Sequence, residues 1–138
     1  MRVCLLVCVL LVVAADASAA ETPLYKSEDC NRYTVQMDLN MCAGTNAEAA
    51  DKKLNEVYKQ VMDSRGDEAA RASLRRSERD WIKYRDKHCD EEVGPQADGG
   101  SIWPMEMSNC LEQETAKRIR ALQRMLTCTA GVSVCNPH

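Results

Sequence analysis

The sequence predicts an all-α domain, a three-helix bundle in up-down-up, antiparallel order that is stapled by disulfides. Three stretches repeat apolar residues at intervals of three and four, the spacing of one buried helical face. Phe is absent and aromatic residues make up only 4% of the chain. The core must therefore rest on Leu, Val, Met and Ala, which favours helices over sheets.

Residues 1–20 have the pattern of a cleavable signal peptide. A positive start at Arg2 precedes an unbroken apolar run over 3–13, and the small residues 17–19 read Ala-Ser-Ala, the pattern that signal peptidase cuts after. A retained anchor is the alternative, but the run is about half the length of a bilayer-spanning helix. No cysteine stands where lipidation would need one, so we expect a periplasmic or secreted protein with no membrane anchor after cleavage.

After cleavage, we expect one domain with a lead-in and a tail. Residues 21–33 contain Pro23 and few apolar residues, which predicts an extended lead-in. The helical domain is expected over residues 34–126. Residues 127–138 are expected to form an irregular tail tied by its own disulfide.

The first helix is expected to begin at Thr34, which would cap it, and Gly44 and Asn46 are expected to kink or fray it. Residues 64–67 are expected to end this helix, with Asp67 as the N-cap of the next one. The buried face of this helix is predicted to hold Leu54, Val57, Tyr58, Val61 and Met62.

The second helix is predicted over about 68–89, and the third from near Met105 or Ser108. Between them, residues 90–104 hold Gly94-Pro95 and Gly99-Gly100, which predicts the longest irregular loop of the domain. Short connections favour antiparallel neighbours among the three helices.

The charge of the chain argues against nucleic acid as a partner. The formal net charge is −3, and it stays −3 without residues 1–20, which hold one basic and one acidic residue. Such a mild and mixed charge is compatible with a basic protein partner but does not demand one.

Six cysteines remain after cleavage, which in an exported small domain indicates a disulfide framework. They are Cys30, Cys42, Cys89, Cys110, Cys128 and Cys135. No C-x-x-C pair occurs, so we expect no metal site and no cofactor. Cys30 can reach Cys42 only if the lead-in doubles back, because a continuous helix would hold them about 18 Å apart. The alternative joins Cys42 to Cys89 and Cys30 to Cys110, and a local Cys128–Cys135 bond is the simplest choice for the tail.

Catalytic chemistry is not expected. The sequence contains no nucleophile elbow, phosphate loop or zinc-protease motif. Glu78 and Asp86 are candidate acid/base carboxylates, and His88 is a candidate base, but surface and structural roles explain all three as readily. A hydrolase would lose activity in Glu78→Gln or Asp86→Asn without unfolding, whereas we expect these changes to lower the melting temperature.

The densest motif is interpreted as a structural cluster that pins two helices together. Its members are Glu78, Trp81, Tyr84, Arg85 and Asp86. Arg85 is expected to bind a carboxylate from the first helix, with Asp51 and Glu56 within reach.

Distinctive stretches follow one another along the chain. They are Cys30, Met37-Asp38-Leu39-Asn40-Met41-Cys42-Ala43, Ala50-Asp51-x-x-Leu54-Asn55-x-x-Tyr58, Glu78-x-x-Trp81-Ile82-x-Tyr84-Arg85-Asp86-x-x-Cys89, Gly99-Gly100-Ser101 and Cys110-Leu111-x-x-x-Thr115-x-x-Arg118. In these stretches, over roughly residues 29–126, the chain resembles the lysozyme inhibitor LprI-like domain family of bacterial exported proteins.

The resemblance implies a helical exported domain with disulfides Cys30–Cys42 and Cys89–Cys110, and it implies inhibition of lysozyme. Lysozymes are usually basic, so a mildly acidic binder would be steered toward them. The loop 91–104 would then block the cleft through residues that we name as candidate partner contacts, with Trp103 as the anchor. These residues are Glu91, Glu92, Asp98, Ser101 and Trp103.

Two other interpretations remain open at this point. Trp103 would equally well pack over the ends of the second and third helices. The chain could also be a periplasmic structural or interaction module with an envelope partner other than lysozyme. The sequence does not determine the oligomeric state.

Overall fold

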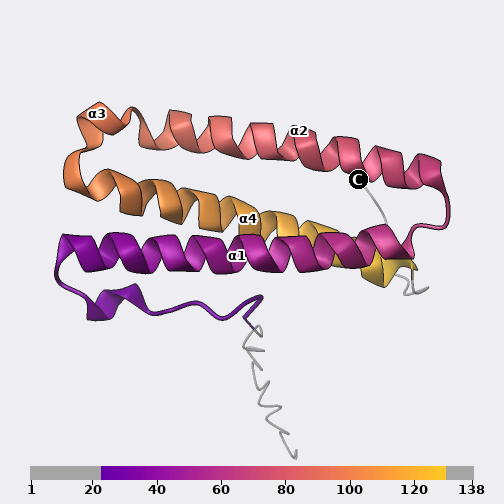
Figure 1. Ribbon diagram of the computed structural model, residues 1–138, viewed down its shortest axis with the longest axis horizontal. Helices are drawn as coiled ribbons and strands as arrows, with labels where there is room; N and C mark the ends of the chain where they lie inside the picture. Colours follow the sequence, from indigo (N-terminus) through magenta and orange to yellow (C-terminus); the bar gives the residue numbers. More distant parts are fainter. Residues whose placement is uncertain (1–22, 130–138) are drawn as a thin grey trace, which may run out of the picture.

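The computed structural model describes residues 23–129, which form a bundle of three long helices in up-down-up order (Figure 1). The helices are α1 (Gln36–Ser64), α2 (Glu68–Val93) and α4 (Trp103–Thr129), and no strand occurs among the described residues. The predicted fold class is confirmed. The signal peptide predicted over residues 1–20 lies outside the described residues.

Helix α1 is amphipathic, and its buried face contributes half of the core. Leu54, Val57 and Val61 are buried at the predicted spacing, while Tyr58 and Met62 are half-buried beside them. The prediction of the buried face is thus confirmed, and it follows from the 3.6-residue period of the helix.

The beginning of α1 differs from the expectation in two ways. Val35, not Thr34, is the N-cap residue, and no side chain caps the first turn. The helix runs unbroken through Gly44 and Asn46. Asn46 is buried beneath the lead-in and binds it through two hydrogen bonds. Its Oδ1 accepts from the Glu28 amide at 2.7 Å, and its Nδ2 donates to the Glu28 carbonyl at 2.9 Å.

A tight connection at residues 65–67 joins α1 to α2. The Asp67 side chain accepts a hydrogen bond from the Ala70 amide at 2.7 Å, which confirms it as the N-cap of α2. Helix α2 continues past Cys89 to Val93, and Gly94, at φ 77°, ends it. Positive φ at this position favours glycine.

Residues 90–104 are not the irregular loop that the glycines and prolines predicted. The last turn of α2 occupies the start of this segment, and then follow the one-turn helix α3 (Gln96–Gly99) and the 3₁₀ turn η2 (Gly100–Ile102). Helix α4 begins at Trp103, earlier than expected, and runs to Thr129. Gly94 and Gly100 have positive φ and lie where the chain changes direction between helical turns. The glycines therefore form turns between short helices and not a long irregular loop.

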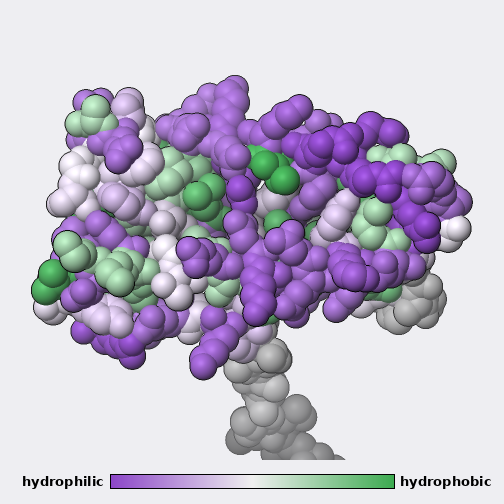
Figure 2. Space-filling model, in the orientation of Figure 1, coloured by the Kyte–Doolittle hydropathy of each residue, from purple (hydrophilic) through white to green (hydrophobic). Residues whose placement is uncertain are grey.

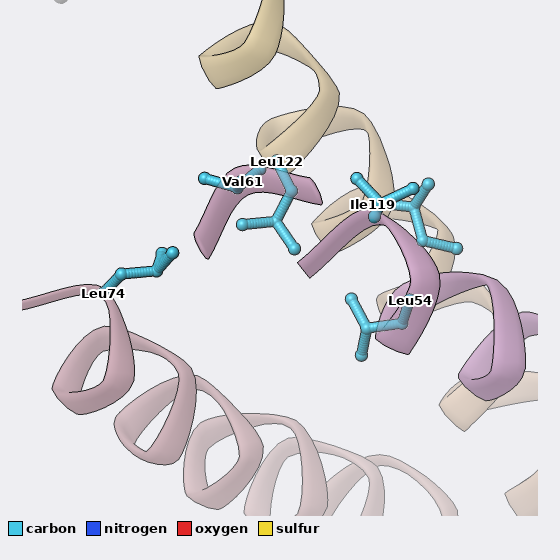
Figure 3. Packing of buried hydrophobic residues seen from close by; sticks show 6 residues of the cluster. Leu54, Val61, Leu74, Ile119 and Leu122 are labelled. Atoms are coloured by element: carbon cyan, nitrogen blue, oxygen red, sulfur yellow. The ribbon is translucent and has the colours of Figure 1, made fainter. Parts of the chain in front are cut away.

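The most extensive packing joins α1 to α4, which run parallel, and α2 packs mainly on α4 (Figure 1). Ile119 and Leu122 of α4 are fully buried against the buried face of α1. Leu74 reaches this cluster from α2 (Figure 3). The bundle is therefore built mainly on the parallel pair α1 and α4. These two helices are not consecutive in the chain, whereas the consecutive long helices run antiparallel.

Within residues 23–129, no helix has the length and apolar character needed to cross a membrane.

Candidate functional site

Both disulfides of the described residues lie at the same end of the bundle. Cys30 bonds to Cys42 with Cα atoms 5.8 Å apart, and Cys89 bonds to Cys110 with Cα atoms 5.7 Å apart. The first bond forms because the lead-in doubles back into a 3₁₀ turn, η1 (Cys30–Arg32), beside the start of α1. The pairing that the resemblance implied is confirmed, and the alternative pairing is wrong.

The predicted Cys128–Cys135 bond cannot be placed, because Cys135 and the Cys128 side chain lie outside the described part of the structure. Helix α4 includes residues 127–129, so the predicted tail begins later than residue 127.

We call residues 30–46 and 89–110 the stapled end. Hydrogen bonds reinforce the disulfides there. The Asn40 side chain donates to the Ser101 carbonyl at 2.9 Å, and Gln36 contacts the Met105 sulfur at 3.9 Å, so the start of α1 is tied to η2 and α4. The Trp103 indole donates to the Gly94 carbonyl at 2.9 Å. This end therefore presents a surface of fixed shape.

The stapled end is strongly acidic on the side formed by α2, α3 and α4. Residues 90–106 hold five acidic residues and no lysine or arginine. Glu91, Glu92 and Asp98 are exposed. Glu91 pairs with Lys87 at 3.4 Å and Glu92 with His88 at 3.1 Å, but the five carboxylates of residues 90–106 outnumber these partners, so the surface stays negative.

The same end exposes apolar side chains. Met37 and Met41 are 69% and 66% exposed, the highest values among the large hydrophobic residues that the structure describes. Val35 and Ile102 are also exposed, at 58% and 42%. In Figure 2, residues of intermediate and apolar hydropathy are most frequent toward this end, while hydrophilic residues cover much of the rest of that face. Exposed apolar groups within a polar surround are typical of interaction sites.

A shallow recess of about 280 Å³ lies between the end of α2 and the start of α4, next to the Cys89–Cys110 bond. Acidic and amide side chains dominate its lining, which consists of Glu92, Val93, Glu106, Asn109, Cys110 and Gln113.

All five candidate partner contacts lie at the stapled end. The structure does not, however, present them on a protruding loop, because α3 and η2 order the segment. Trp103 is half-buried, its indole nitrogen is bonded to Gly94, and its ring lies against Gly99. Trp103 thus packs the end of the bundle, while Glu91, Glu92 and Asp98 remain open to a partner.

The cluster around Trp81 lies at the centre of the bundle, away from the stapled end. Arg85 Nη1 binds Asp51 Oδ1 at 3.0 Å, which confirms the predicted link to the first helix. It also lies 3.3 Å from the hydroxyl of Thr115, so all three helices meet at Arg85. Glu56, the other expected partner, pairs with Lys53 of its own helix instead.

Arg118 is a member of this cluster that the sequence motif did not include. Its Nε and Nη2 lie 2.9 and 2.7 Å from Glu78 Oε2, and both side chains are nearly buried. The guanidinium groups of Arg118 and Arg85 both lie near the Trp81 ring, at 5.6 and 5.3 Å from its centre. These are cation–π distances. Thr115 and Arg118 lie three residues apart in α4, but this spacing alone does not place Arg118 opposite Glu78.

Tyr84 and Asp86 lie at the outer side of the cluster. Tyr84 is 56% exposed and its ring stacks on His88 at 5.6 Å. Asp86 is exposed and binds Arg85 at 2.9 Å. Glu78 is paired with Arg118 and lies eight residues from Asp86, about 12 Å along the helix. The two carboxylates are therefore poorly placed to act as an acid/base pair.

One group of potential metal ligands occurs among the described residues, and its chemistry does not suit a metal. His88, Glu92 and Cys110 bring ligand atoms within 4.8 Å of one another. Cys110, however, is bonded to Cys89 and cannot supply a thiolate. Glu114, buried nearby, lies 3.7 Å from His88 and binds Lys117 at 2.5 Å, and the hydrogen bond to Glu114 raises the pKa of the lysine.

Comparisons with known proteins show the family to which the chain is similar. The sequence profile of the family described as lysozyme inhibitor LprI matches residues 27–122. An uncharacterised protein of Rhizobium meliloti (strain 1021) is 38% identical over 129 residues, which cover 85% of this chain and 89% of that protein. No solved structure matches the chain.

Proposed function

Because the chain belongs to the LprI lysozyme inhibitor family, we propose that it is an exported protein that binds a lysozyme through its stapled end and inhibits it. The profile match spans both disulfides and most of the bundle, so the family assignment covers the surface to which we assign binding.

The observation that carries the proposal is the acidic, rigid surface of the stapled end. Five acidic residues without a lysine or arginine between residues 90 and 106 create a local negative potential on a chain of mild overall charge. Lysozymes are usually basic, so this potential would speed encounter and orient the complex. The two disulfides reduce the ordering cost of binding.

Export is part of the proposal. Disulfides persist in oxidising compartments such as the periplasm or the cell exterior. The apolar run and the Ala-Ser-Ala pattern in residues 1–20 are typical of a signal peptide that directs export to such a compartment. Wall-degrading enzymes act in those compartments, so inhibitor and target would meet there.

The primary test is a lysis assay with the chain from Glu21 onward, produced with its disulfides formed. We expect it to slow the lysis of peptidoglycan by at least one class of lysozyme at micromolar concentration. Absence of inhibition across several lysozyme classes would refute the proposal. A stable complex with an envelope protein in place of lysozyme would favour an interaction module instead.

A charge-reversal variant tests the assigned surface. Glu91→Lys combined with Asp98→Lys should weaken inhibition about tenfold or more, because it removes the attraction for a basic partner. The matched control is Asp63→Lys, near the opposite end of the bundle, where Asp63 is exposed and pairs only with Lys59. If the control weakened inhibition as much as the double variant, the stapled end would not be the contact surface.

A further inference from the structure

The methionine pair Met37–Met41 is the second feature of the stapled end that calls for a partner. The two residues are one helical turn apart on α1, so their side chains are neighbours on one face. Gly44 continues that face, and a Cβ added there would meet no atom within 4 Å. Both thioethers therefore stand on an open surface.

This exposure is built into a rigid part of the fold. Cys42, which follows Met41, is buried and bonded to Cys30, and Asn40, which precedes it, is bonded to the Ser101 carbonyl. In contrast, the methionines elsewhere in the described helices are half-buried: Met62, Met105, Met107 and Met125. The backbone that carries the pair is held on both sides, while both methionines are mostly exposed.

The chemistry of the pair favours an aromatic surface. A methionine side chain is flexible and polarisable, adapts to irregular apolar recesses and makes favourable contacts with aromatic rings. Ligand-binding clefts are lined mainly by apolar and aromatic side chains. The acidic residues of the same end, together with exposed Asp38 beside the pair, complement a cationic rim around such a cleft.

We propose that Met37 and Met41 insert into the aromatic-lined, polysaccharide-binding cleft of a cationic wall-degrading enzyme. This inference rests on the proposed function and specifies how the protein inhibits the enzyme. The pair occupies the position of sugar rings, so inhibition is competitive with the polysaccharide. The acidic residues of the stapled end lie on the rim and set the orientation.

The pair also makes inhibition sensitive to oxidation. Hydrogen peroxide transfers an oxygen atom to a thioether sulfur and leaves water, and the resulting sulfoxide is polar. Because Met37 and Met41 are the most exposed methionines of the described residues, they react first. Sulfoxides in the cleft would lose the apolar contact.

Three variants test the inference with one lysis assay. Met37→Gln/Met41→Gln should raise the concentration for half inhibition about tenfold, since it keeps the length of the side chains but not their apolar character. Met37→Leu/Met41→Leu should stay within about threefold of the wild type. Ile82→Gln, at a 40% exposed apolar position of α2 outside the stapled end, is the matched control and should not change inhibition.

Competition and oxidation complete the experiment. Soluble N-acetylglucosamine oligomers should weaken binding of the wild type to lysozyme, which surface plasmon resonance measures directly because the oligomers themselves slow lysis. Peroxide treatment, quenched before lysozyme is added, should weaken inhibition by the wild type but not by the leucine variant. A glutamine variant that inhibits within about twofold of the wild type would overturn the inference while leaving the proposed function intact. A wild type that inhibits no lysozyme would overturn both.

Discussion

Glu78 and Arg118 form the most buried ion pair between helices, at 2.7 Å with side chains 11% and 12% exposed. Pairs of this kind hold helices in register, because each charge needs its partner once it leaves water. The Arg118 guanidinium lies beside the Trp81 ring, 5.6 Å from the centre of the ring. The motif of residues 78–89 thus supplies contacts between helices inside the bundle.

Glu78→Gln is expected to lower the free energy of unfolding by about 2 to 4 kcal/mol, because it leaves the Arg118 guanidinium nearly buried without a counter-charge. The matched change Asp63→Asn, at an exposed pair with Lys59, should cost less than about 0.5 kcal/mol. Urea unfolding monitored by circular dichroism measures both. Equal losses would contradict a structural role for the Glu78–Arg118 pair.

Tyr25 ties the lead-in to α4, since its hydroxyl donates to Glu112 Oε1 at 2.7 Å. Burial and this carboxylate raise the pKa of Tyr25 above its ordinary value. The folded state then holds the proton more tightly than the unfolded state, so the stabilisation is complete below the unfolded pKa and is lost as pH rises toward the folded one.

Tyr25→Phe should therefore lower the melting temperature at neutral pH, and the gap to the wild type should narrow between about pH 9 and about pH 11. Melting curves across this range provide the measurement. A gap that stays constant with pH would show that the hydrogen bond to Glu112 does not control the ionisation of Tyr25.

Single elements differ in how they are held. Helix α1 has a long buried face and packs along α4, whereas α2 depends on fewer apolar contacts, chiefly Leu74 and Trp81. The Cys89–Cys110 bond joins the end of α2 to α4 across 21 residues, while Cys30–Cys42 ties only the lead-in to α1. We therefore expect the Cys89–Cys110 bond to hold α2 against α4, as the apolar core holds α1 against α4.

Cys89→Ala/Cys110→Ala should reduce the free energy of unfolding by about 3 kcal/mol, the typical value for a loop of this length. The expected pattern of hydrogen exchange is a selective loss of protection in the last turns of α2. Cys30→Ala/Cys42→Ala is the matched control, and its loss of protection should be confined to the lead-in and the first turn of α1. Loss of protection throughout α1 in the control would contradict this division.

Over the whole molecule, charge is distributed unevenly along the bundle. Residues 65–79, the connection and the first half of α2, hold five basic and three acidic residues, whereas residues 90–106, at the stapled end, hold five acidic residues and no lysine or arginine (Figure 1). The protein is therefore bipolar although its net charge is only −3. A bipolar molecule orients in the field of a charged partner before contact.

Association with a basic lysozyme is expected to slow about tenfold or more when salt rises from about 50 mM to about 500 mM, because exposed charges are screened beyond the Debye length. The dissociation rate should change much less, since the apolar contacts at the stapled end are not screened. Surface plasmon resonance at several salt concentrations separates the two rates. An association rate that does not respond to salt would exclude electrostatic steering.

The sequence by itself determined the helical class, the order of the helices and the buried face of α1. The reason is that these features depend on local periodicity and capping: Leu54, Val57 and Val61 repeat at helical spacing, and Asp67 caps α2. The disulfide pairing came from the family resemblance, because spacing alone left an alternative open.

Only the tertiary structure decided how distant residues meet. Arg118 faces Glu78 and Asn46 clamps Glu28, contacts that no local pattern reveals, since they depend on how the helices and the lead-in pack. The glycines of residues 94–100 suggested a loop, but the segment forms short helical turns in which Trp103 packs against Gly99. The same packing gathered both disulfides, the acidic residues and the methionine pair at one end, which makes that end a candidate surface for a partner.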